Sequence, residues 1–216
     1  MSPRPRTTSD EDLLKALHAV VTRLGPNLTL ADVAKEAGVS AATLVQRFGS
    51  KRGLLLAFAA LAETGTDEEF AAIRQQHPDP IDAIRAVVRC YALMAPTPEA
   101  VSNGLAFLQM DLSDPEFHRY ALAQARATLV EIKNILDDAV RAGRLVKCNT
   151  EELAFALHAI IGGAMVSWGI LRDGTAEAAM LRAADMLLRP YVKPAVSGRS
   201  TYATSGARGR RGDRRR

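Results

Sequence analysis

The sequence predicts an all-α fold, and three observations support this. Apolar residues recur at intervals of three or four, and they almost nowhere alternate at the period of two that indicates a strand. Glycine, proline and capping residues divide these periodic segments at helix-length intervals. Hydrophobic residues make up 48% and charged residues 24% of the 216 positions, which is the composition of a folded chain and not of a disordered one.

The N-terminal part of the chain is expected to form four helices, of which the fourth is longer than the second and third. Each starts beside a residue that caps helix N-termini well, and the first three end at glycine. The capping residues are Ser9, Thr29, Ser40 and Ser50, and the glycines are Gly25, Gly38 and Gly49. In the third helix, Leu44 and Phe48 lie four positions apart and give it one inward stripe.

Longer helices are expected further along the chain. Their predicted ranges are Thr66 to Gln76, Pro80 to Ala95, Pro98 to Met110, Asp114 to Ala142, Thr150 to Arg172 and Thr175 to Tyr191. We therefore expect an N-terminal domain over residues 1–64 and a helical domain over residues 65–191. Residues 192–216, rich in Gly, Ser and Arg, predict a basic disordered tail.

The charge is unevenly distributed along the chain. Residues 1–53 carry a net charge of +3, residues 54–191 carry −6, and residues 192–216 carry +7. Two basic ends on an acidic middle suggest a polyanionic partner that is contacted by the ends. The arginines of the tail would either add nonspecific affinity for DNA or only keep the end of the chain soluble.

The most informative segment runs from Thr29 to Leu56. Two short helices meet at Gly38, where a sharp corner needs a residue free to adopt positive φ, and Val39 can anchor the corner in the core. The second of these helices predicts an outward face of small or polar residues: Ser40, Ala41, Ala42, Thr43, Gln46 and Arg47. Such a face can approach a DNA groove closely and hydrogen-bond to base edges.

These residues resemble the TetR-type transcriptional repressors. The resemblance covers about the first sixty residues, and it is carried by Thr29, Asp32-Val33-Ala34, Ala37-Gly38-Val39-Ser40, Thr43-Leu44, Phe48, Ser50-Lys51 and Leu54. It implies a three-helix DNA-binding head with a helix-turn-helix on an all-helical homodimer. It also implies a C-terminal domain that dimerises and holds a small-molecule effector, which switches the affinity for an operator in double-stranded DNA.

The resemblance also assigns roles to single residues. Thr29, Thr43 and Lys51 match positions that contact phosphates. Ala41, Ala42, Gln46 and Arg47 match positions that approach base edges, and Ser40 is a further candidate for DNA binding on the same outward face. At Val45 the chain departs from the family, which usually has an aromatic residue there that packs on the DNA backbone. Val45 can still offer an apolar contact, but its presence supports an alternative: a helical small-molecule or metal-binding protein whose motif no longer binds DNA.

An effector pocket is expected among the middle helices. Aromatic residues, methionines and one histidine supply adaptable apolar contacts with a few polar anchors. The candidate residues are Tyr91, Met94, Phe107, Met110, Phe117, Tyr120, His158, Met165 and Trp168. Helical spacing alone also explains many of them as ordinary core.

The last two helices are expected to form the dimer interface, because their apolar stripes exceed what one small domain can cover. The candidate residues are Leu157, Ile161, Gly163, Ala164, Ala184, Leu187 and Leu188. A monomer core is the alternative. The uncharged run from Leu153 to Leu171 approaches the roughly 20 residues that cross a bilayer, but its glycines, His158 and Ser167 make it weakly lipophilic, so no membrane partner is expected.

Other site chemistries find little support in the sequence. The acidic cluster at Asp111, Asp114 and Glu116, with His118, resembles a metal site, but helix capping explains most of it. No nucleophile set beside a base and no phosphate loop occurs, so neither an enzyme nor a cofactor is expected. Two cysteines and the absence of a leader indicate a reducing cytoplasm.

Overall fold

The computed structural model describes residues 8–193, apart from the side chains of residues 62–64. Over these residues the chain forms α-helices and one 3-10 turn, and no strand, so the all-α prediction is confirmed. The helices are α1 (Asp10–Leu24), α2 (Leu30–Ala37), α3 (Ala41–Phe48), α4 (Lys51–Gln76), α5 (Pro80–Leu93), α6 (Pro98–Ser113), α7 (Pro115–Arg141), α8 (Thr150–Leu171) and α9 (Ala176–Leu188), with η1 (Gly25–Asn27) after α1. All but the first two residues of the predicted basic tail lie outside the described residues.

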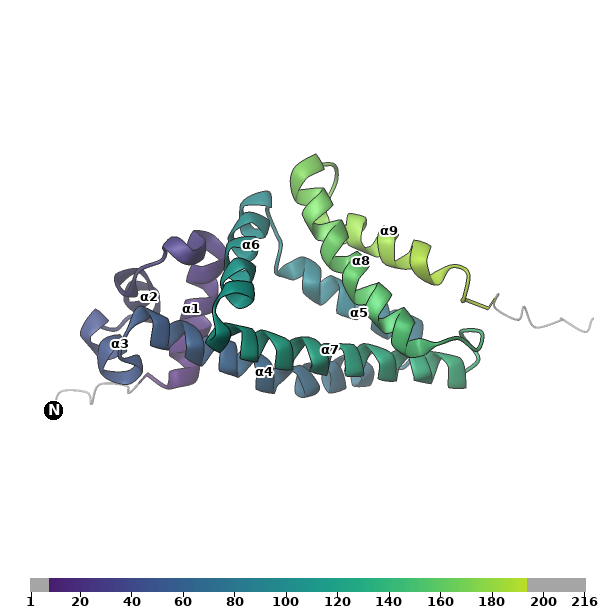
Figure 1. Cartoon of the computed structure of the whole chain (residues 1–216), viewed down its shortest axis with the longest axis horizontal. Coiled ribbons are helices and arrows are strands. Elements are labelled where there is room, and N and C mark those ends of the chain that lie inside the picture. The colour runs from purple at the N-terminus through teal and green to yellow at the C-terminus, as the bar shows by residue number, and fades with distance from the viewer. Residues whose placement is uncertain (1–7, 194–216) are drawn as a thin grey trace, which may run out of the picture.

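The helices form a small unit and a larger one (Figure 1). We call residues 8–61 the head; it contains α1, η1, α2, α3 and the first part of α4. We call residues 65–193 the body. Helices α4 and α7 lie side by side along the length of the molecule, and α6 stands between α1 and α8. Helices α5, α8 and α9 pack together at the end of the body away from the head.

The head has a hydrophobic core of its own, which we call the head core. Its members from the head are Leu13, Leu14, Leu17, Val20, Leu28, Val33, Ala34, Leu44, Leu54 and Leu55. One further member, Phe117, comes from the first turn of α7 and is only 4% exposed. Phe107 and Met110 of α6 pack against the same cluster. The head core is therefore completed by side chains from the body.

The body has a larger cluster, the body core, drawn mainly from α4, α5, α7, α8 and α9, with Val101 from α6 and Leu145 from the α7 to α8 connection. Its fully buried large side chains include Ile84, Ile132, Ile135, Leu136, Leu145, Leu157 and Ile161. Helix α5 is buried on most sides, because α4, α7 and α9 surround it. This core fixes how the long helices are arranged.

Helix starts follow the predicted caps, but one expected break does not occur. Ser9, Thr29, Ser40 and Ser50 each accept a hydrogen bond from the backbone N–H three residues on. A separate helix was expected to start at Thr66, whereas α4 continues without interruption from Lys51 to Gln76. Glycine lowers helix propensity by only about 1 kcal/mol, and packing along α7 is enough to hold Gly65 in the helix.

The last described residues return to the connection between α7 and α8. Leu145 and Val192 form an isolated antiparallel bridge. The Val146 amide donates to the Tyr191 carbonyl at 2.8 Å, and the Lys193 amide donates to the Arg144 carbonyl at 3.0 Å. These bonds hold the chain at the end of the body farthest from the head (Figure 1).

Candidate nucleic-acid interface

Helices α2 and α3 meet at a glycine corner. Gly38 adopts a left-handed conformation with φ 67° and ψ 29°, and its amide faces the Ala34 and Lys35 carbonyls. The Val39 amide donates to the Ala34 carbonyl at 2.9 Å, and the half-buried Val39 side chain packs against the head core. The predicted helix-turn-helix corner is confirmed in both respects.

Helix α3 turns one side toward the head core and leaves the other open. Leu44 is fully buried and Phe48 is half-buried, as their spacing predicts. The exposed residues of this segment are Ser40, Ala41, Ala42, Val45, Gln46 and Arg47, and Thr43 is half-buried. Val45, at 47% exposure, gives this surface its apolar spot. Because most of these side chains are short, another molecule can approach the α3 backbone closely.

The two threonines expected to contact phosphates belong to helix starts. Thr29 Oγ1 donates to Asp32 Oδ2 at 2.6 Å, and the Asp32 amide donates back to Thr29 Oγ1 at 3.2 Å. The hydrogen bonds from Thr29 hold the pKa of Asp32 below its usual value. Ser40 Oγ and Thr43 Oγ1 lie 2.9 Å apart at the start of α3. Both helix N-termini thus have a hydroxyl beside N–H groups of the kind that bind phosphate.

Arg47 does not extend freely from α3. Its Nη1 donates to the Thr8 carbonyl at 2.5 Å and to Asp10 Oδ1 at 2.9 Å, so the guanidinium joins α3 to the start of α1. The side chain of Arg47 is 26% exposed and that of Asp10 is 68% exposed. An ion pair this open to solvent contributes little to stability and can be exchanged for another anion. Asp10 is 37 positions away from Arg47, so no local sequence pattern indicates that the two side chains meet.

Lys51 is also engaged within the head. Its Nζ donates to the Pro26 carbonyl at 2.6 Å, and the side chain is half-buried. The bond joins the first turn of α4 to η1. The ammonium group has three donors, so two remain for an anion.

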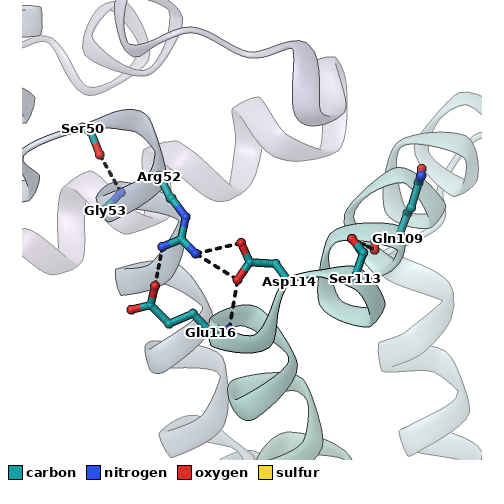
Figure 2. A network of polar contacts seen from close by, with 7 residues as sticks. All are labelled: Ser50, Arg52, Gly53, Gln109, Ser113, Asp114 and Glu116. Carbon is teal, nitrogen blue, oxygen red and sulfur yellow. Dashed lines mark hydrogen bonds and ion pairs between the residues drawn. The ribbon is translucent and has the colours of Figure 1, made fainter.

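Arg52, which the sequence did not single out, forms the most extended polar network of the joint between head and body (Figure 2). Its Nη2 donates to Asp114 Oδ2 at 2.7 Å and to Oδ1 at 2.9 Å, and its Nη1 donates to Glu116 Oε2 at 2.5 Å. The guanidinium carbon lies 5.4 Å from the centre of the Phe117 ring. Arg52 thus contacts two carboxylates and one aromatic ring of the body.

These contacts account for the acidic cluster that resembles a metal site. Asp114 caps α7, accepting from the Glu116 amide at 2.9 Å, and it binds Arg52 with the same carboxylate. The hydrogen bonds from Arg52 hold the pKa of Asp114 below its usual value. His118 Nδ1 lies 3.2 Å from the Asp111 carbonyl oxygen, not from a carboxylate. Among the side chains that the structure describes, no group of three or more potential ligands is arranged to hold a metal ion.

The head matches a known family in sequence. The sequence model described as bacterial regulatory proteins, tetR family, matches residues 13–58, which contain the corner, all of α3 and the start of α4. Over these residues the head is similar to the tetR family of bacterial regulatory proteins. A comparison with curated protein sequences gave no match.

The fold of the described chain is shared with solved structures of low sequence identity. SmeT of Stenotrophomonas maltophilia, the repressor of a multidrug efflux pump, is 21% identical with a TM-score of 0.63, over 88% of this chain and 93% of that one. A TetR transcription regulator from Haloarcula marismortui is 17% identical with a TM-score of 0.69, over 85% and 98%. A putative regulator from Saccharomonospora viridis in complex with choline is 21% identical with a TM-score of 0.69, over 86% and 98%.

Six of the residues expected to form an effector pocket separate into two groups. Phe107, Met110 and Phe117 belong to the head core or pack against it. Tyr91, Met165 and the 7% exposed Trp168 belong to the body core or pack against it. The structure therefore does not gather these six side chains in one place.

The remaining three pocket candidates differ in exposure. His158 is half-buried, with its ring edge-on to Tyr91 at a centroid distance of 6.2 Å. Burial lowers the pKa of His158 and raises that of Tyr91, and Thr128 of α7 is buried at 5% exposure. Met94 is 59% exposed, and the half-buried Tyr120 ring lies 4.6 Å from the Arg119 guanidinium carbon. Tyr91, Thr128 and His158 thus place polar groups beside apolar core.

Two hollows open on the body surface, each of about 460 Å³. The first is lined by Arg74, His77, Pro78, Pro80, Ala83, Ile135, Asp138, Arg141 and Ala142. The second is lined by Ile81, Arg85, Arg144, Asp185, Leu188, Arg189 and Val192. None of the expected effector-binding residues lines either hollow.

The expected dimer residues lie on more than one side of α8 and α9. Leu157, Ile161, Ala184 and Leu188 are at most 2% exposed and are covered by the body core of the same chain. Gly163 is exposed, and Ala164 and Leu187 are half-buried. Four of the seven are therefore unable to reach a partner without opening the core.

The opposite side of α8 is apolar as well. Phe155 is 65% exposed and Ile170 is 76% exposed, and Ala159 and Gly163 lie between them at helical spacing. In the part of the chain that the structure describes, α8 is the one helix long and apolar enough to cross a membrane, judged by length and composition alone. Its inner side packs on α7 and α9, so its unusual hydropathy comes from having two apolar sides.

Proposed function

We propose that the chain is a transcriptional repressor that binds an inverted-repeat operator in double-stranded DNA as a homodimer. The observation that carries this proposal is the open face of α3, with small side chains at Ala41, Ala42 and Val45 and polar ones at Gln46 and Arg47. A helix with such a face fits the major groove, and a two-fold dimer presents two of them.

Phosphate contacts would come from the ends of the helices beside this face. Thr29 and Thr43 lie at the starts of α2 and α3, where unpaired N–H groups favour anions. Lys51 retains donors after its bond to Pro26. These groups would fix the register on DNA, and the α3 face would supply the choice of sequence.

The dimer interface that we now propose uses the outer sides of α8 and α9. Phe155, Ile170 and Met186 are 65%, 76% and 59% exposed, which is unusual for large apolar side chains. A Cβ atom added at Gly163 meets nothing within 4 Å, so this position leaves room for a second helix. Pairing two copies across these sides would give a four-helix interface. This use of α8 is preferred to a membrane span.

We further propose that a small, largely apolar effector binds in the body and releases the operator. Tyr91, Thr128 and His158 offer polar anchors next to the body core. Leu105, Leu108 and Leu112 of α6, which are 39%, 46% and 71% exposed, offer apolar contact. SmeT, which has a similar fold, has been solved with triclosan, and this chain would bind a ligand of comparable apolar character.

The proposed compartment is the cytoplasm. Cys90 and Cys148 are free thiols, and burial raises the pKa of both, which slows their oxidation. Such thiols are suited to a reducing compartment.

Selection of bound sequences from random double-stranded DNA tests the proposal. We expect an inverted repeat with two half-sites about one helical turn apart. Lys51→Ala should weaken binding to all sequences alike, and it should reduce the slope of the logarithm of affinity against the logarithm of salt concentration by about one. Equal affinity of the full chain for selected and scrambled DNA would contradict the proposal and support a helical binding protein whose α3 face no longer reads DNA.

A further inference from the structure

The first contact between α6 and the head is made by Asn103. Its side-chain amide donates to the Thr22 carbonyl at 3.1 Å and to the Arg23 carbonyl at 3.2 Å, both in the last turn of α1. The residue four positions after Thr22 is Pro26, which has no N–H to bond to that carbonyl. Asn103 therefore supplies the N–H donor that the residue four positions after Thr22 cannot provide.

The fit around Asn103 is close. Gly25 follows α1 with φ +58°, and a Cβ atom added there would lie 2.4 Å from Asn103 Oδ1. Only glycine therefore lets η1 approach α6 to this distance. The end of α1 and the second turn of α6 are fixed to each other.

The second contact lies at the other end of α6. Asp114 is at once the C-cap of α6 and the N-cap of α7, and it holds both Nη2 bonds of Arg52. Glu116 binds the other guanidinium nitrogen (Figure 2). The adjacent Phe117 is inserted into the head core. Arg52 stands in the first turn of α4, next to Lys51 and directly after α3.

The two contacts are separated along α6. Asn103 and Asp114 are eleven positions apart, which is about 16 Å along a helix. A head held at one point could pivot, whereas a head held at two separated points keeps one angle relative to α6. The direction of α3 relative to the body is thus set by Asn103 and Arg52 together.

We propose that Arg52 and Asn103 are positioning residues that determine which spacing of operator half-sites the dimer accepts. The inference rests on the proposed function, because it concerns two heads on one inverted repeat. Inserting one base pair moves a half-site by about 3.4 Å and rotates it by about 35°. A head with a fixed angle cannot follow this movement, whereas a head released at one contact can.

The experiment uses the full chain and a set of duplexes that carry the two selected half-sites with the spacing changed by −1, 0, +1 and +2 base pairs. The variants are Arg52→Gln, Asp114→Asn and Asn103→Ala. Asparagine caps helices as well as aspartate does, so Asp114→Asn keeps the start of α7 while it loses the charge. Arg52→Gln and Asp114→Asn change the net charge in opposite directions, so a purely electrostatic effect would move their affinities apart.

We expect the wild type to lose at least about tenfold in affinity for each unit change of spacing, since a misplaced half-site forfeits its base contacts. For each variant, the affinity should fall by only about two- to threefold across the same series of spacings. The preferred half-site sequence should stay unchanged. The control is Arg89→Gln, which breaks a similarly exposed ion pair with Glu177 between α5 and α9 and should keep the narrow wild-type profile.

Two results would overturn the inference. One is a wild-type profile in all three variants, and the other is a uniform loss of affinity at every spacing, which a general loss of folding would produce. Failure of the proposed function looks different, because the wild type itself would then gain nothing from a second half-site at any spacing.

Discussion

In the head, Leu13 and Leu17 of α1 and Leu44 of α3 meet in one small core, while the opposite sides of these two helices carry mostly small or polar side chains. In the body, α8 is apolar both on the side that carries Leu157 and on the side that carries Phe155. A helix with one apolar side specifies its own orientation. A helix with two apolar sides needs cover on both of them, and in α8 the same chain covers only the side that carries Leu157.

The division between head and body is least clear at Phe117, which lies in α7 of the body but packs in the head core. We expect Phe117→Ala to lower the free energy of unfolding by about 3–5 kcal/mol and to reduce amide-exchange protection in α1 to α3. Phe70→Ala is the matched control, because Phe70 is equally buried at 4% exposure but lies in the body core. Phe70→Ala should lower the free energy of unfolding by a similar amount, but it should leave the amide-exchange protection of α1 unchanged. If both variants expose the same amides, head and body are a single cooperative unit.

A second prediction concerns the outer side of α8. Gly163→Arg should leave the single chain folded, because the new side chain meets nothing within 4 Å, and it should weaken dimerisation by about 3–5 kcal/mol through an unpaired charge in the interface. Sedimentation measures the oligomeric state, and Gly65→Arg, at another open helical glycine, is the control. A dimer that survives Gly163→Arg would place the interface elsewhere and leave the exposed side of α8 for another partner.

A third prediction separates two roles of Arg47. If its guanidinium leaves Asp10 to bind guanine, Arg47→Ala should cost about 1–3 kcal/mol of discrimination between the selected and a mismatched operator. Asp10→Asn should instead keep the discrimination and raise overall affinity, since it removes a negative charge beside the α3 face. Competition binding with both duplexes measures this. Equal losses in the two variants would mean that Arg47 only fastens α3 to α1.

The smallest expected effect is a pH dependence in the body. Burial lowers the pKa of His158, so the unfolded chain takes up a proton there at a higher pH than the folded chain does. The stability linked to His158 is therefore complete above about pH 6.5 and is lost as the pH falls through the lowered pKa. Because the side chain is partly exposed, we expect well under about 1 kcal/mol.

Denaturant unfolding at pH 7 and pH 5.5 measures the difference in the free energy of unfolding between the two pH values. This difference should be smaller in His158→Gln than in the wild type. The control is His118→Gln, which alters an exposed histidine and should keep the wild-type difference. An unchanged pH dependence in His158→Gln would show that other groups cause it.

The head could be predicted closely because its signals are local. Gly38, Ser40 and the pair Leu44 and Phe48 act within a few residues of their own positions, and the structure places them as their spacing indicates. The contacts that join distant parts of the chain carry no such signal. Arg52 and Asp114 are 62 positions apart, and nothing in the residue types indicates that they meet.

In the body, the sequence pattern indicates which residues are buried better than it indicates which helices they pack against. The helical period marks Phe107 and Phe117 as inward-facing but cannot say that they face the head. For α8 the pattern cannot choose between two apolar sides, and the tertiary packing made that choice at Leu157 and Ile161. The helix break expected near Gly65 is absent because contact with α7 outweighs a weak local preference.

The bridge between Leu145 and Val192 bears on how the protein can be handled. Because backbone bonds at Val146 and Lys193 clamp the chain beside the α7 to α8 connection, a group attached to Lys193 itself is anchored at the end opposite α3. A chain shortened to end at Lys193 and captured on a sensor surface through a label there would therefore present its head outward, whereas a label on Thr8 would stand next to Arg47 and hinder the approach of a duplex.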